Sequence, residues 1–339
     1  VAVLGIHQEP EKAAFYVPEY LHDEGFDVWK QGAHAGPPLA VIVSTDAHYS
    51  IARTLRIMGW GDRGVIAAPI DAHHRLTPEA AETALGQAGD RRVIGIVAAA
   101  GSTATGAFDP LHELADVAER HGLWLHVDAA HGGGVALSET QRSKLRGIER
   151  ADSVVWDAHK LLMMPALVTA VIYRREAHAY EAFAQQASYL FADATPDQSW
   201  WDLGQRTLEC TKRAMALELW SALRTQGEAW FGEVVDRQAE LARQLAAKVA
   251  AAPDFELALM PESNIVCFRH LGSVTPGELD AHNRMLRKRV IEDGTFYIVG
   301  TQLPGGFYLR STLMNPLTEE VDLDALLDYL RELSLPCRP

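Results

Sequence analysis

Short apolar runs alternate with amphipathic stretches between residues 39 and 174. The apolar runs predict strands at 39–45, 64–71, 92–101, 123–130, 152–158 and 167–174. Between them, apolar residues at helical spacing predict helices at 48–59, 77–89 and 110–122. Thr77 is suited to cap the second helix, with Pro78 at its first position. Strands that alternate with helices in this way indicate a largely parallel, doubly wound α/β sheet.

The pattern changes after about Leu208. Residues 213–252 have a helical pattern with one break near Gly227, and strands are predicted at 255–259, 263–270 and 306–312, with helices at 276–293 and 318–333. We therefore predict a large α/β domain over residues 30–212 and a smaller α+β domain over residues 213–339. Residues 1–29 form a separate strand, loop, helix and strand pattern.

Composition narrows the class of protein. The chain has 339 residues, of which 48% are hydrophobic and 22% charged, as in soluble globular proteins. A net charge of −14 argues against a nucleic-acid partner. Cys210, Cys267 and Cys337 are far apart in the sequence, which predicts free thiols and neither a disulfide framework nor a zinc site. No apolar stretch approaches the ~20 residues that span a bilayer, and the start lacks a signal-peptide pattern, so we expect a cytoplasmic protein without a membrane partner.

Two charged residues stand at the ends of apolar strands. Lys160 follows the run "SVVWDAH", and Asp128 closes "LWLHV". Ligands bind at the carboxyl ends of strands in open α/β sheets. Lys160 could form an imine with a carbonyl cofactor or extend its amine to solvent. Asp128 could keep a heteroaromatic nitrogen protonated or accept backbone hydrogen bonds. A lysine and an aspartate at neighbouring strand ends, suited to opposite edges of one cofactor ring, indicate such a site more specifically than either residue alone.

Other strand-end features are weaker by themselves. His48 could cap a helix or lie flat on a cofactor ring, and Thr103 could be a turn residue or reach a ring oxygen. The motif "HGGG" (131–134) resembles an esterase oxyanion loop, but the chain has no G-x-S-x-G motif to accompany it. His73 and His74 would point in opposite directions on an extended segment, so no metal site is expected.

Three stretches carry a resemblance to a known family. They are "DAHYSIARTLRIMG" (46–59), "GSTATGAFDPLHELADVAERHGLWLHVDAAHGGG" (101–134) and "ADSVVWDAHKLLMMP" (151–165). They resemble the group II pyridoxal-phosphate amino-acid decarboxylases, which include glutamate, cysteine-sulfinate, diaminobutyrate and aromatic amino-acid decarboxylases. The similarity extends from about residue 30 to the C-terminus and includes "ASYLF" (187–191) and "DLGQRTLECTKRAMALELW" (202–220). It implies fold type I, the aspartate-aminotransferase-like fold.

The resemblance also implies roles for individual residues. Lys160 would be the Schiff-base lysine, Asp128 the partner of the pyridinium nitrogen, and His48 the residue stacked on the ring. The supporting contacts would be Thr103 near the phenolic oxygen, Ala130 beside the ring and His159 at the phosphate. Arg213, which follows Lys212, and Arg310 are candidate partners of the substrate carboxylate. The family places active sites at dimer interfaces, so a homodimer that acts on an amino acid is expected.

Two regions depart from the family pattern. Family members carry a glycine-rich "GGT" or "GGS" phosphate-binding stretch, and residues 1–29 stand in its place. They resemble the first half-unit of a CoA-binding Rossmann-type domain, so we expect the N-terminal part of the large domain to be truncated or replaced and the phosphate site weakened. After "YLF", Trp200 and Trp201 occupy a region where the family carries a proton-donating tyrosine. We expect less efficient reprotonation.

Three functions remain open from the sequence. The first is decarboxylation of an L-amino acid to the amine and carbon dioxide by a pyridoxal-phosphate-dependent carboxy-lyase. The second is an aminotransferase or other carbon–nitrogen chemistry on the same fold, distinguished from the first by whether carbon dioxide is released. The third is a catalytically impaired remnant or chimera that acts as a binding module. The missing glycine-rich stretch favours the third function, and the pair Asp128–Lys160 opposes it.

Overall fold

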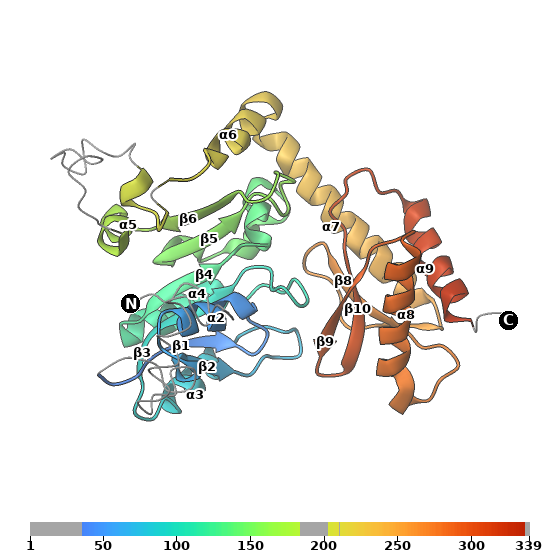
Figure 1. Cartoon of the computed structure of the whole chain (residues 1–339), viewed down its shortest axis with the longest axis horizontal. Helices are drawn as coiled ribbons and strands as arrows, with labels where there is room; N and C mark the ends of the chain where they lie inside the picture. The colour runs from blue at the N-terminus through green and yellow to red at the C-terminus, as the bar shows by residue number, and fades with distance from the viewer. Residues whose placement is uncertain (1–35, 184–202, 210, 336–339) are drawn as a thin grey trace, which may run out of the picture.

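The computed structural model describes residues 36–183, 203–209 and 211–335. Figure 1 shows two α/β units joined by the long helix α7 (Glu228–Ala251). The predicted half-unit at 1–29 and the segment with Trp200 and Trp201 lie outside the described residues. No described helix is both long enough and apolar enough to cross a bilayer.

The first unit is built on a six-stranded sheet with the order β2-β1-β3-β4-β5-β6. Its strands are β1 (Leu39–Ser44), β2 (Val65–Ala68), β3 (Arg92–Ala99), β4 (Trp124–Asp128), β5 (Ser153–Asp157) and β6 (Thr169–Tyr173). The first five are parallel, and β6 pairs antiparallel with β5. The prediction of six strands in a largely parallel sheet is confirmed.

The helices of this unit begin and end where local chemistry favours it. They are α2 (Tyr49–Ile57), α3 (Pro78–Gly86), α4 (Leu111–His121) and α5 (Glu176–Phe183), the last of which was not predicted. The Thr77 side chain caps α3 by accepting from Ala80 N at 3.2 Å, as predicted. Gly122 ends α4 in the left-handed conformation, which costs glycine little.

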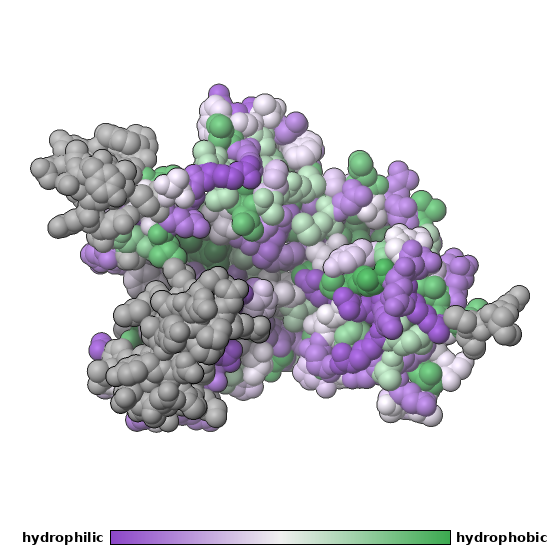
Figure 2. Space-filling view, viewed as in Figure 1, coloured by the Kyte–Doolittle hydropathy of each residue, from purple (hydrophilic) through white to green (hydrophobic). Residues whose placement is uncertain are grey.

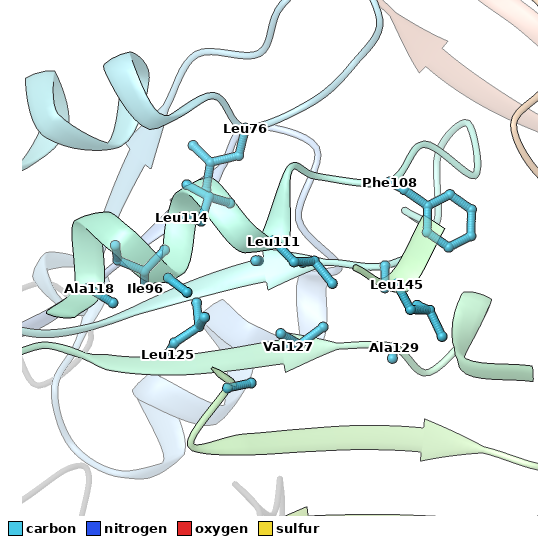
Figure 3. Close-up of a cluster of buried hydrophobic side chains, with 14 of the residues drawn as sticks. Leu76, Ile96, Phe108, Leu111, Leu114, Ala118, Leu125, Val127, Ala129 and Leu145 are labelled. Atoms are coloured by element: carbon cyan, nitrogen blue, oxygen red, sulfur yellow. The ribbon is translucent and has the colours of Figure 1, made fainter. Parts of the chain in front are cut away.

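The core of the sheet lies between its strands and α4. Ile96, Leu125 and Val127 from β3 and β4 face Leu111 and Leu114 of α4 (Figure 3), and all five are at most 1% exposed. Burying each such side chain stabilises the fold by about 1.5–3 kcal/mol. The core therefore fixes the positions of β3 and β4, and with them the start of the loop at the carboxyl end of each strand.

The second unit is a four-stranded antiparallel sheet with the order β7-β8-β10-β9. Its elements are β7 (Phe255–Leu257), β8 (Ile265–His270), α8 (Leu279–Asp293), β9 (Val299–Leu303), β10 (Gly306–Thr312) and α9 (Glu320–Ser334). The strand β9, of sequence "VGTQL", was missed because it has too few apolar residues to give a clear alternation. Hydrophilic residues dominate the surface over α8 in Figure 2.

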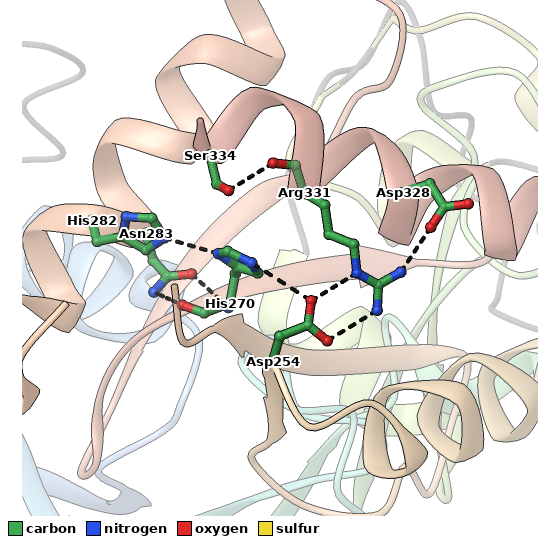
Figure 4. A network of polar contacts seen from close by, with 7 residues as sticks. All are labelled: Asp254, His270, His282, Asn283, Asp328, Arg331 and Ser334. Atoms are coloured by element: carbon green, nitrogen blue, oxygen red, sulfur yellow. Dashed lines mark hydrogen bonds and ion pairs between the residues drawn. The ribbon is translucent and has the colours of Figure 1, made fainter. Parts of the chain in front are cut away.

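A polar network ties the second sheet to its helices (Figure 4). Arg331 of α9 binds both carboxylate oxygens of Asp254, at 2.7 and 3.0 Å. His270 Nδ1 lies 3.0 Å from Nε2 of His282, and the Asn283 side chain bonds the backbone N and O of His270. Burial lowers the pKa of both histidines, so this network connects neutral imidazoles.

Helices α6 (Met215–Gln226) and α7 connect the two units, with the predicted break at Gly227, whose φ is 82°. Phe231 and Val235 of α7 are buried in the core of the first sheet. Leu241 and Leu245, further along the same helix, are buried in the core of the second. One continuous helix therefore packs on both cores, and the predicted domain boundary at 212–213 stays a prediction.

Candidate active site

One cavity of about 360 Å³ lies at the carboxyl ends of four strands of the large sheet. It is bordered by the segments that follow β1, β3, β4 and β5. The lining residues include His48, Gly101, Thr103, Asp128, Ala130, His131, Asp157 and Lys160. Chain connections leave β1 and β3 in opposite directions along the sheet, which makes this edge the topological switch point where α/β proteins bind ligands.

Lys160 lies in the turn that follows β5. Its Nζ is 3.0 Å from Oδ2 of Asp157, and its side chain is 32% exposed. The other oxygen of Asp157 accepts a hydrogen bond from Thr169 Oγ1 at 2.6 Å. The amine is thus neither buried without a partner nor free in solvent. It stands in the cavity wall, held by a carboxylate whose own position is fixed by the neighbouring strand.

Asp128 ends β4 and lines the same cavity. Within the part of the chain that the structure describes, its carboxylate accepts a single hydrogen bond, from Ala130 N at 3.1 Å. The second oxygen is therefore available to a cationic N–H donor. The structure shows the backbone hydrogen bond, and because Asp128 also lines the cavity, the role toward a ring nitrogen stays a prediction.

His48 and Thr103 lie on the side of the cavity formed by β1 and β3. His48 is the N-cap of α2, and its Nδ1 is 2.7 Å from Ser50 Oγ. Capping fixes the imidazole at the cavity rim, so His48 can cap α2 and face a cofactor ring at the same time. Thr103 is exposed in the loop after β3, and this loop closes through Ser102 N to Ala107 O at 2.8 Å.

The three glycines after His131 are packing residues. A Cβ on Gly132 would lie 2.4 Å from Ala100 O, and one on Gly134 would lie 2.8 Å from Leu161 Cβ. These contacts bring the segment after β4 directly against the ends of β3 and β5. The glycines of the "HGGG" motif therefore allow the segment that carries Asp128 to pack closely against the segment that carries Lys160. This packing accounts for the glycines without an esterase function.

We expect Gly133→Ala to destabilise the protein by about 1–3 kcal/mol, because a methyl group there must displace a packed ring. The added Cβ would lie 2.4 Å from Trp156 Cδ1. Urea unfolding measures the change. Gly86→Ala is the matched control, since a Cβ at this helix end meets nothing within 4 Å. Equal stability of Gly133→Ala and the parent protein would contradict this packing.

His131 was not predicted as a site residue, although it lies three positions after Asp128. Its Nε2 is 2.7 Å from Oδ1 of Asn264, and its side chain is buried against the cavity. Burial, with smaller contributions from Arg310 and Lys160, lowers the pKa of His131 to about 4. No sequence pattern links His131 to Asn264, which is 133 positions away.

This histidine makes stability depend on pH. Its pKa falls from 6.5 to about 4 on folding, so the unfolded chain binds more protons between those values. We expect stability to be lost as the pH falls from 6.5 to 4, by at most about 3 kcal/mol from this residue. Denaturant unfolding of the parent and of His131→Gln over this range measures the difference. Parallel pH profiles would contradict the assignment.

The other predicted residues lie at different distances from the cavity. Ala130 lines it, whereas His159 turns to the backbone, with Nδ1 3.0 Å from Val168 O. Arg310 of β10 borders an adjoining cavity of about 360 Å³ that also contains His48 and Thr103. The structure does not bring Arg213 to either cavity, because its exposed side chain pairs with Glu218 at 3.1 Å.

Asp46 and His74 form a pair that was not predicted. His74 Nδ1 lies 2.6 Å from Asp46 Oδ2 at the rim of the adjoining cavity. The expectation of an extended segment at His73–His74 is wrong, because Asp71 closes a turn there and His74 has a φ of 62°. The described residues contain no group of three or more His, Cys, Asp or Glu that could hold a metal.

The donor set of the main cavity fits pyridoxal phosphate. An amine (Lys160), a carboxylate with a free oxygen (Asp128) and an imidazole (His48) border one space. These are the groups needed to hold an aldehyde, a protonated ring nitrogen and the face of a ring. Within the described residues, a glycine-rich phosphate-binding stretch of the family type is absent from this cavity.

Comparisons with known proteins agree with this fit. The model of the pyridoxal-dependent decarboxylase conserved domain matches residues 31–271. Human cysteine sulfinic acid decarboxylase is 35% identical over 321 residues, which cover 91% of this chain and 65% of the human protein. The mouse acidic amino acid decarboxylase GADL1 is 31% identical over 322 residues, which cover 91% of this chain and 58% of that protein. This chain thus spans less than two thirds of the length of either relative.

Solved structures give the same result. Mouse CSAD aligns with a TM-score of 0.82 at 33% identity, covering 93% of this chain and 67% of that one. Oryza sativa TDC with PLP and tryptamine aligns with a TM-score of 0.82 at 27% identity, covering 93% and 65%. These alignments confirm fold type I. The family model covers more than half of the sequence, and this chain therefore belongs to the pyridoxal-dependent decarboxylase family.

Proposed function

We propose that the chain is a pyridoxal-phosphate-dependent carboxy-lyase that converts an L-amino acid to its amine and carbon dioxide. The observation that carries the proposal is the presence of Lys160 and Asp128 in the wall of one cavity, at neighbouring strand ends. The relatives named as decarboxylases support the same reaction. An aminotransferase needs a comparable cavity, so the reaction class is decided by experiment.

Each cavity residue has a defined task in this proposal. Lys160 would hold the cofactor through its amine, and Asp128 would hold a proton on the ring nitrogen through its free oxygen. His48 would orient the ring from the side of α2, while Thr103 and Ala130 would bound its edges. His159 would reach the phosphate through Nε2, because its Nδ1 is bonded to Val168 O. Pyridoxal phosphate, when bound, supplies the electron sink for the charge left when the carboxylate departs.

Arg310 is the better of the two candidates for the substrate carboxylate. It is half-buried beside the adjoining cavity, with Nη1 2.9 Å from Thr312 Oγ1. Its Nε is buried and has no hydrogen-bond partner among the described residues. Arg213, in contrast, is 78% exposed and paired. The names of the relatives favour a small acidic amino acid as substrate.

We further propose that the active form is a homodimer. Among the described residues, β6 is an edge strand of the large sheet; its Ile172 is 52% exposed, and its Val171, 54% exposed, lines the main cavity. Unpaired apolar edges of this kind are usually covered in native proteins. Light scattering at assay concentrations measures the mass, and an active monomer would contradict this part of the proposal.

Carbon dioxide release tests the main proposal. The full chain is incubated with pyridoxal phosphate and, in turn, cysteine sulfinate, aspartate, glutamate and an aromatic amino acid. We expect carbon dioxide and the matching amine from at least one acidic substrate. A keto acid without carbon dioxide would show the aminotransferase reaction. No cofactor absorbance band and no product would favour the binding-module alternative.

A further inference from the structure

Three consecutive residues of the small domain, Glu262–Asn264, precede β8 and contact the segments that border the main cavity. Glu262 Oε2 accepts from Phe108 N at 3.0 Å, and Glu262 also forms an ion pair with Arg75. Ser263 lies against Gly106, where a Cβ would come within 1.8 Å of Ser263 Oγ. This connection is therefore docked on the loop that carries Thr103.

Asn264 completes the connection by contacting His131, which lines the main cavity. It is 2% exposed, and its side chain lies between His131 Nε2 at 2.7 Å and Leu313 O at 3.2 Å. A carbonyl oxygen can only accept, so the Asn264 amide group donates to Leu313 O. The Asn264 side-chain oxygen must then accept from His131. It follows that Nε2 carries the ring proton, and Nδ1 of a neutral His131 carries none.

The surroundings of His131 favour the neutral ring. The charged groups that face it are Lys160 and Arg310, which disfavour a second cation, and Asp157, which favours one. Asp128 lines the same cavity. Burial outweighs the contribution of Asp157, so the ring is uncharged at neutral pH. Lys144 and Arg75 contact Glu262, not Asn264, and so leave the amide orientation unchanged.

We propose that Asn264 is a positioning residue of the cofactor cavity, which holds His131 as its neutral Nε2–H tautomer. The imidazole then adds an unprotonated Nδ1 acceptor, and no positive charge, to the wall shared with Lys160 and Asp128. A cationic His131 would compete with the ring nitrogen for the Asp128 charge. This inference rests on the proposed function, because it takes the cavity to be the cofactor site.

The test uses the full chain and four variants. Asn264→Asp keeps the size and the acceptor, adds a negative charge and loses the donor to Leu313 O, whereas Asn264→Leu loses both the acceptor and the donor. Asn315→Leu is the matched control, since the exposed Asn315 side chain accepts only from Leu317 N, at 3.0 Å, among its described contacts. Nitrogen-15 NMR measures the tautomer and pKa of His131, assigned by its absence in His131→Gln. Absorbance titration with pyridoxal phosphate measures affinity from pH 5.5 to pH 8.5.

We expect Nδ1 of His131 to be unprotonated in the parent protein. Asn264→Leu should give mixed tautomers and bind the cofactor about twofold more weakly at every pH, because only about half of the His131 rings would then be the Nε2–H tautomer. Asn264→Asp should raise the pKa of His131 and weaken binding only below that pKa. Asn315→Leu should match the parent.

Two results would overturn the inference. One is a protonated Nδ1 in the parent protein, a measurement that needs no variant to fold. The other is an unchanged pH profile of cofactor binding in Asn264→Asp while the pKa of His131 rises. A parent protein with the Nε2–H tautomer but no cofactor band would instead count against the proposed function.

Discussion

Under the proposed function, Lys160→Ala should lower the decarboxylation rate by about 10⁴-fold or more, because the amine that would hold the cofactor is removed. In the part of the chain that the structure describes, Lys160 is the only lysine in the cavity wall. The variant should also lose the visible absorbance that pyridoxal phosphate acquires on attachment to a protein amine. Rates of carbon dioxide release and absorbance spectra measure the two effects separately.

The fold should survive this substitution. Lys160 is 32% exposed and contacts Asp157, which keeps its second partner, Thr169 Oγ1. Lys288→Ala is the matched control, because Lys288 is 74% exposed on α8 and pairs only with Glu292 among the described residues. A Lys160→Ala variant that retains the absorbance band would move the attachment point to another amine and would refute the assignment.

The sequence predicted the parallel strands well because their physical signal is local. Buried parallel strands are continuous apolar runs, and capping residues such as Thr77 mark the helices between them. Strand direction is not local. The sequence of β6 is as apolar as those of the parallel strands, yet β6 pairs antiparallel with β5. The connection between them is too short for a crossover helix, and Gln238 of α7 donates a hydrogen bond to it at Leu161 O.

For the candidate active site, too, the local features were predictable and the contacts between distant segments were not. Strand-end positions and the family resemblance pointed to Lys160, Asp128, His48 and Thr103, and all four line one cavity. Contacts between distant segments could not be predicted. His131–Asn264 joins residues 133 positions apart, and Glu262–Phe108 joins residues 154 apart. Neither has a sequence pattern, because each depends on how the small domain docks on the large one.

Asp128→Asn should lower the decarboxylation rate by about 10²- to 10³-fold, the loss typical of removing one preorganised electrostatic contact. In the parent protein Ala130 N donates to Oδ1 of Asp128 at 3.1 Å. The amide oxygen of the variant can accept the same hydrogen bond, so the turn after β4 should keep its shape. Under the proposed function, the charge that would hold a proton on the cofactor ring nitrogen is lost. The ring is then a weaker electron sink, and the barrier to carbon dioxide loss rises.

This variant separates binding from chemistry more sharply than Lys160→Ala does. Because Lys160 is intact, the absorbance band should remain, and the loss should fall on kcat more than on KM. Asp90→Asn is the matched control, since Asp90 is 69% exposed and pairs with Arg63. Asp128→Glu should recover part of the rate, because it restores the charge in a shifted position. A fully active Asp128→Asn variant would show that the carboxylate only accepts the backbone hydrogen bond, and the ring nitrogen would then need another partner.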